Sequence, residues 1–88
     1  MDLSTLINNC PAPISTAEGV TSAITWLNTA RVFCDVSTIE AVPNKTDIAV
    51  RAQSFADSIA IASTDYTSIN NNLMHIKLML GGVQAVIT

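Results

Sequence analysis

Apolar residues recur at alternating steps of four and three from residue 48 to the end of the chain. This stripe has twelve positions, all apolar or aromatic: Ile48, Ala52, Phe55, Ile59, Ala62, Tyr66, Ile69, Leu73, Ile76, Leu80, Val83 and Ile87. Such spacing over roughly six heptads is the pattern of a coiled-coil seam. It predicts a long C-terminal helix over residues 46–87, although residues 63–72 are mostly poor helix formers that only packing would hold.

A straight helix of this length would measure about 60 Å at a rise of about 1.5 Å per residue. A compact domain of 88 residues has a radius of gyration of only about 12 Å. The helix must therefore either break or bury its stripe against other copies. Residues 74–87 are apolar nearly all round, which is typical of a helix buried on every side. We expect a self-assembly interface at the C-terminal end of the stripe, formed by Ile69, Leu73, Ile76, Leu80, Val83 and Ile87.

The first half of the chain predicts one shorter helix over residues 15–37. The sequence Ser15-Thr16-Ala17-Glu18 has the form of a capping box, and Val20, Ala23 and Leu27 begin an apolar face. After residue 37 this helix either continues to Ala41 or gives way to a short second one. The clearest break is 42–47, where Pro43 ends what precedes it and Asn44 or Thr46 can cap the next helix.

A short loop between two helices favours an antiparallel pair. The sequence therefore predicts an all-α fold, a helical hairpin over residues 15–88 with a long C-terminal helix. Residues 1–14 form an N-terminal segment with a helical turn and a spacer that contains Pro11 and Pro13. Glycines are scarce, but Gly81-Gly82 interrupt the long helix and predict a kink or a close helix approach.

The charge content narrows the classes of partner. Charged residues make up 12% of the chain, the net charge is −3, and the four basic residues are scattered. Nucleic acid binding needs a clustered positive patch, so this partner is not expected. Direct membrane insertion is not expected either, because the longest uncharged stretch, residues 3–17, is shorter than a membrane span and contains polar groups. A surface so poor in charge either belongs to a small soluble domain or is buried between identical subunits.

No pattern for catalysis, for a metal or for a cofactor stands out, so an enzyme is not expected. His75 is the only histidine and has no acidic residue within one helical turn. Cys10 and Cys34 are either bridged or two reduced, buried thiols. Tyr66 and Asn70-Asn71-Asn72 either form a hydrogen-bonded layer that fixes helix register, or the tyrosine hydroxyl simply reaches solvent.

Several short features resemble the needle-filament subunits of bacterial type III secretion systems. They are Pro43-Asn44 in the turn, Gln53, Tyr66, Asn72, Lys77, and the apolar end at residues 83–87. The chain departs from that family at Lys45, where a second proline is usual, and at Leu78, where an acidic residue is common. The resemblance implies a helical hairpin that polymerises around a narrow export channel with its C-terminal helix inward.

These observations together predict a structural subunit that assembles with itself into an exported filament. It would be secreted or at the cell surface without a cleaved signal peptide, because Met1-Asp2 opens the chain without a basic region. Its partners would be other copies and components of a secretion or assembly apparatus. The alternatives are a small helical chaperone or adaptor, cytoplasmic in location, that binds a partner helix, and a viral assembly protein.

Overall fold

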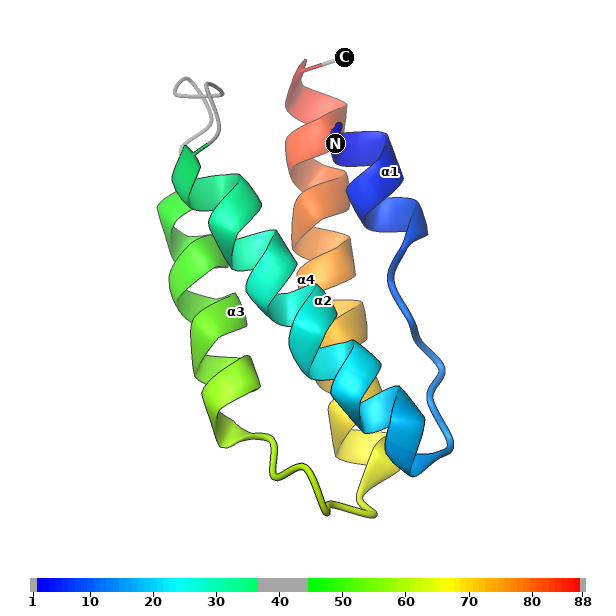
Figure 1. Cartoon of the computed structure of the whole chain (residues 1–88). Coiled ribbons are helices and arrows are strands. Elements are labelled where there is room, and N and C mark those ends of the chain that lie inside the picture. The colour runs from blue at the N-terminus through cyan, green and yellow to red at the C-terminus, as the bar shows by residue number, and fades with distance from the viewer. Residues whose placement is uncertain (1, 37–44, 88) are drawn as a thin grey trace.

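The computed structural model describes residues 2–36 and 45–87, without the side chains of residues 35, 36, 45 and 85–87. These residues form four helices, α1 (Leu3–Asn8), α2 (Ala17–Val36), α3 (Lys45–Ser58) and α4 (Tyr66–Ile87). The helices α2, α3 and α4 run up, down and up, and α1 lies beside α4 near both chain ends (Figure 1). The predicted all-α class is confirmed for this part of the chain.

The prediction of one continuous helix over residues 46–87 is wrong, because residues 59–65 interrupt it and reverse the chain. Side chains compete here for the backbone groups of the helix. The Ser58 hydroxyl donates to the Phe55 carbonyl at 2.9 Å, and the Ser63 hydroxyl accepts the Asp65 N–H at 3.1 Å. The Asp65 carboxylate then accepts the Ser68 N–H at 3.2 Å and caps α4. The long helix was expected either to break or to bury its stripe against other copies, and in the structure it breaks.

The reversal brings the two halves of the stripe together inside one chain. The radius of gyration is 12.5 Å and the longest dimension is 38 Å, which accommodates the 22 residues of α4 at roughly 33 Å. The apolar sides of the four helices meet in a single core. Its largest fully buried side chains are Leu6, Val20, Leu27, Ile48, Leu73, Ile76 and Leu80.

The helices α2 and α3 lie antiparallel to each other (Figure 1), and their ends differ from the expected ones by small shifts. The two-helix hairpin predicted over residues 15–88 is not found, because the described residues in this range form three helices. The N-cap of α2 is Thr16 rather than Ser15, since the Thr16 hydroxyl accepts the Gly19 N–H at 3.2 Å. Thr46 lies inside α3 and does not cap it. The predictions for Pro43, Asn44 and the continuation of the first helix to Ala41 fall outside the described residues.

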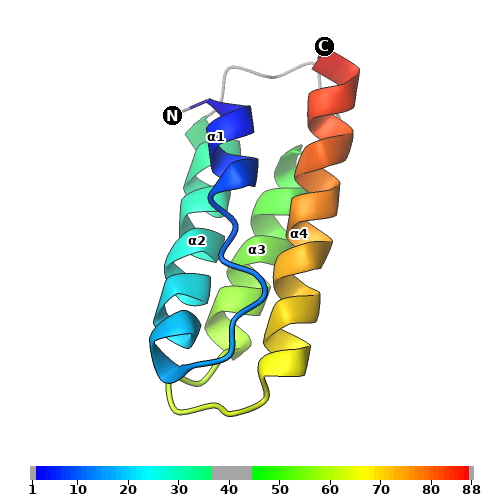
Figure 2. The same ribbon diagram turned by 90° about the vertical axis from the view of Figure 1, so that its right-hand side faces the viewer.

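The N-terminal segment belongs to the same core as the hairpin. Leu3, Leu6 and Ile14 are all buried in it. Figure 2 shows α1 and the extended residues after it running along the bundle between α2 and α4. A helix of six residues is too short to be stable alone in water, so α1 depends on these contacts.

Candidate interaction surfaces

The residues predicted to form the self-assembly interface lie in the core of the single chain. Their exposed fractions are 2% for Ile69, 0% for Leu73 and Ile76, 1% for Leu80 and 6% for Val83. The side chain of Ile87 is outside the described part of the structure. While the bundle is closed, the five buried side chains cannot reach another copy. An interface for assembly has to be sought on other faces.

One such face is the outer side of α4, directly opposite the stripe. Leu78 is 72% exposed and Met74, one turn earlier, is 43% exposed. Gly81 and Gly82 continue towards the C-terminus, and a Cβ atom placed on either one would meet nothing within 4 Å. Neither glycine therefore serves a close helix approach to another described part of the chain. The expectation that residues 74–87 are buried on every side is wrong for a single copy.

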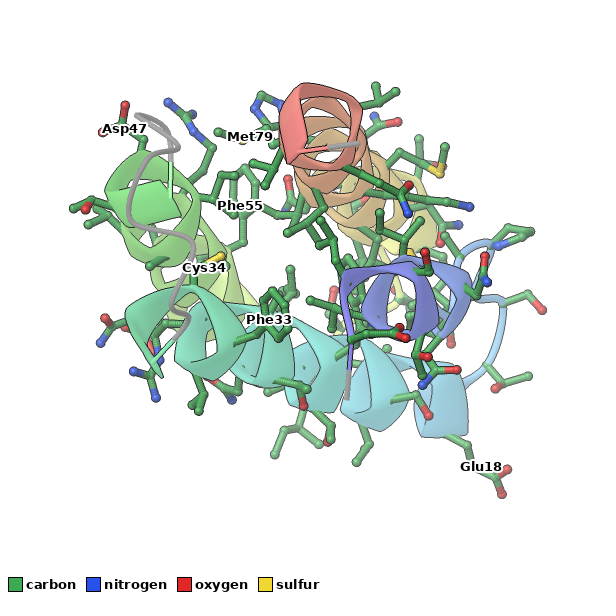
Figure 3. All side chains as sticks on the ribbon, turned by 90° about the horizontal axis from the view of Figure 1, so that it is seen from above. Glu18, Phe33, Cys34, Asp47, Phe55 and Met79 are labelled. Carbon is green, nitrogen blue, oxygen red and sulfur yellow. The ribbon has the colours of Figure 1, made fainter. Side chains whose placement is uncertain are left out.

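A second surface is the groove between α3 and α4. It has a volume of about 480 Å³ and is lined by Asp47, Val50, Arg51, Ser54, Phe55 and Met79. Figure 3, seen from the end that carries both termini, shows Phe55 and Met79 side by side between the two helices. The His75 ring meets the Phe55 ring edge-on, with 5.8 Å between centroids. The groove thus has an apolar floor with one carboxylate and one guanidinium among its lining groups.

A third surface is the channel between α2 and α4 that holds residues 2–14, here named the strap. Three hydrogen bonds fix the strap through its backbone, which makes them independent of its side chains. The Asn70 amide pairs with both backbone groups of Ile14, accepting its N–H at 2.7 Å and donating to its C=O at 3.1 Å. The Trp26 indole N–H donates to the Leu6 carbonyl at 2.9 Å.

The role found for Asn70 differs from the one considered for the asparagine run. Its amide anchors the strap rather than building a polar layer between helices, and Asn71 beside it is exposed. The sequence placed Asn70 next to the stripe but contained no signal for its partner, which lies 56 positions away. Tyr66 is half-buried at the start of α4.

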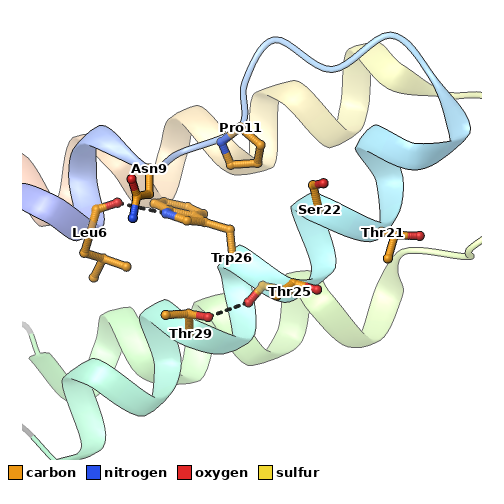
Figure 4. Close-up of a pocket in the computed structure, with 8 residues that line it drawn as sticks. All are labelled: Leu6, Asn9, Pro11, Thr21, Ser22, Thr25, Trp26 and Thr29. Carbon is orange, nitrogen blue, oxygen red and sulfur yellow. Dashed lines mark hydrogen bonds between the residues drawn. The ribbon is translucent and has the colours of Figure 1, made fainter. Parts of the chain in front are cut away.

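Beside the strap a shallow cavity of about 420 Å³ opens between it and α2 (Figure 4). Leu6, Asn9 and Pro11 line it from the strap, and Thr21, Ser22, Thr25, Trp26 and Thr29 from α2. The Thr29 hydroxyl donates to the Thr25 carbonyl within the helix at 2.8 Å. The lining groups are uncharged, and the cavity shows that the strap stands away from α2 near Pro11.

The cysteines and the possible metal ligands form no organised site in the described part of the chain. Cys10 is half-buried, Cys34 is buried, and neither takes part in a disulfide, so the bridge considered between them is absent. Within residues 2–36 and 45–87, no group of three or more His, Cys, Asp or Glu side chains could hold a metal ion. None of the described helices is both long and apolar enough to cross a membrane.

Comparison of the chain with protein-family models, with curated proteins and with solved structures finds no match.

Proposed function

We propose that this protein is a structural subunit that acts by association with copies of itself, through contact rather than catalysis. The outer face of α4 is the observation that supports this most directly. Leu78 and Met74 expose apolar surface there that contributes nothing to the fold of one copy. Burying apolar area is worth roughly 25 cal/mol per Å², so covering this face stabilises an assembly.

The low charge of α4 favours a second copy as the partner that covers it. Between Tyr66 and Ile87 the helix has no acidic residue and a single lysine, Lys77. Two such faces can approach each other with little repulsion between like charges. Gly81 and Gly82 leave the backbone of α4 open on its outside, so a second helix can pack closely against it.

The finer proposal, an exported filament like a secretion needle, has separate support. It stands on Pro43-Asn44, Lys77 and the other short features shared with that family. A contact between two α4 faces alone closes a dimer, so a filament also requires a head-to-tail contact between two different faces, which extends indefinitely. Negative-stain microscopy of the pure protein distinguishes long filaments from closed rings or dimers.

The experiment for self-association is one charge placed on the outer face of α4. Leu78→Asp puts a carboxylate where the proposed contact is apolar, and sedimentation velocity should show loss of the large species. Because Leu78 is 72% exposed, circular dichroism of the variant should stay that of the wild type. Val32→Asp is the matched control, since Val32 is 44% exposed on α2. An unchanged assembly of Leu78→Asp would overturn the proposal for this face.

A helical adaptor is the second candidate, and the groove between α3 and α4 favours it. Val50, 64% exposed, with Phe55 and Met79 on the floor, offers apolar surface to an amphipathic partner helix. A wild-type protein that sediments as a monomer at every concentration favours this candidate over self-association. Val50→Asp should then weaken capture of the partner helix while Leu78→Asp does not.

A further inference from the structure

The contacts of α1 are suited to exchange between copies. Leu3 and Leu6 of α1 insert into the core, the Trp26 indole holds the Leu6 carbonyl, and the side-chain amide of Gln84 donates to the Ser4 hydroxyl. These contacts define the α1 seat, which is formed by α2 and α4. An identical α1 from a second copy would make each of them equally well, so exchange costs no contact.

The residues that connect α1 to the rest of the strap are held much less firmly. Pro11 and Pro13 have no N–H to donate. Within the described part of the chain, the one side-chain hydrogen bond from residues 9–13 to another element is the weak one from the Cys10 thiol to the Leu73 carbonyl, at 4.0 Å. The cavity of about 420 Å³ beside Pro11 separates this stretch from α2. It is a connector fixed at its far end, where Asn70 binds Ile14 through two hydrogen bonds.

From these observations we infer that α1 of one copy occupies the α1 seat of another copy in the assembly. Ile14 on Asn70 is the pivot, and residues 9–13 are the arm. Five extended residues reach about 17 Å, enough to pass from one bundle to an adjacent one. This inference rests on the proposed self-association, because contact through other faces supplies the high local concentration that makes exchange effective.

Paired cysteines at the seat test the inference directly. In a Cys10→Ala, Cys34→Ala background, Ser4→Cys with Gln84→Cys places one thiol on α1 and one on the facing turn of α4, separated by the reach of the native glutamine side chain. Because this separation exceeds that of a direct disulfide, a short bis-methanethiosulfonate reagent is used to link α1 to the seat it occupies, within one copy or between two. With exchange, non-reducing electrophoresis should show covalent dimers and larger species that increase with protein concentration. Cross-linked monomers alone at every concentration would overturn the inference.

Isotope mixing shows which copy supplied each half of the link. Equal amounts of ¹⁵N-labelled and unlabelled protein are unfolded, refolded together and cross-linked. Trypsin cleaves after Arg31 and Lys77, so residues 4 and 84 lie on different peptides. Exchange predicts that about half of the linked pairs join a heavy to a light peptide, provided all partners are drawn at random. Only heavy–heavy and light–light pairs would contradict it.

A matched control excludes random collision, and sedimentation separates the two proposals. Ser4→Cys with Ser54→Cys puts the second thiol on the exposed side of α3 and should give no concentration-dependent ladder. An equal ladder in this control would count against exchange. An assembly that sediments as large species but contains only links within one copy retains the self-association and refutes the exchange. A monomer without any assembly refutes both.

Discussion

The helices α3 and α4 carry the same apolar stripe but differ on their outer sides. The inner side of α3 buries Ile48 and Ala52 as completely as α4 buries Leu73 and Ile76. On the outside, α3 is polar apart from Val50, whereas α4 exposes Leu78 and Met74. The stripe therefore explains how both helices fold, and only the outer side of α4 has an apolar strip that continues from turn to turn. Surfaces for partners are found where apolar residues exceed what the fold uses.

The largest effect is expected from truncating the stripe. Leu80→Ala removes a side chain that is 1% exposed and should destabilise the monomer by about 2–5 kcal/mol. Leu78→Ala, two positions away on the outer side, should change stability by no more than about 0.5 kcal/mol. Urea denaturation followed by circular dichroism measures both. A Leu80→Ala variant that keeps its monomer stability but no longer assembles would show that the stripe forms contacts between subunits and not the core of one chain.

The sequence pattern identified which residues form the core but not how the chain turns. Heptad spacing continues through Ile59, Ala62 and Tyr66, and an antiparallel pair of helices shows the same spacing as one long helix. The period alone therefore cannot reveal a reversal. The local signal was the run of poor helix formers near Ser63 and Asp65, and these residues do form the turn and the cap of α4.

A second difference between α4 and α3 is that α4 also holds the strap. Substitutions in the asparagine run of α4 test this contact. Asn70→Ala removes both hydrogen bonds to the Ile14 backbone and leaves those groups unsatisfied, which should cost about 1–3 kcal/mol. Asn71→Ala is the matched control, because Asn71 is exposed and alanine is the better helix former. Thermal unfolding of both variants measures the difference. Equal midpoints would show that the strap is not anchored at Asn70.

The strap also shows which contacts of a site cannot be predicted from the sequence. Trp26 and Asn70 are fixed by helix periodicity to particular sides of α2 and α4. Their partners are backbone groups of Leu6 and Ile14, 20 and 56 positions away. Since every residue carries such groups, no side-chain pattern identifies the partners. The outer side of α4, by contrast, follows directly from the apolar residues off the stripe.

A smaller change in monomer stability is expected for substitutions of the glycines, with opposite signs in α4 and α2. Gly81→Ala and Gly82→Ala add a methyl group in open space on α4 and should each stabilise the monomer by about 0.5–1 kcal/mol. Gly19→Ala places a Cβ atom 2.8 Å from that of Ile14, so it should destabilise α2 or displace the strap. Denaturation of the monomers measures the signs. Gly82→Ala combined with loss of assembly would sharpen the contrast between α4 and α3, since close packing requires the glycine only in the assembly.

The smallest effect is expected at the beginning of the strap, where Asp2 caps α1. Its carboxylate accepts the Thr5 backbone N–H at 2.8 Å, and this bond holds the pKa of Asp2 below its ordinary value of about 3.8. A pKa lowered in the folded state means that the cap stabilises α1 above that ordinary value and that its contribution is lost as the pH falls through the folded-state pKa. Carbon-13 NMR titration of the Asp2 carboxyl group measures the pKa.

Amide hydrogen exchange over the same pH range compares the two parts of the molecule. After correction for the intrinsic pH dependence of exchange, α1 amides should lose protection on acidification while α3 amides, which have no contact with this cap, should not. Asp2→Asn keeps an acceptor oxygen without a titrating proton, so α1 should keep its protection in this variant. If α1 of Asp2→Asn loosens with acid as the wild type does, another group controls the strap.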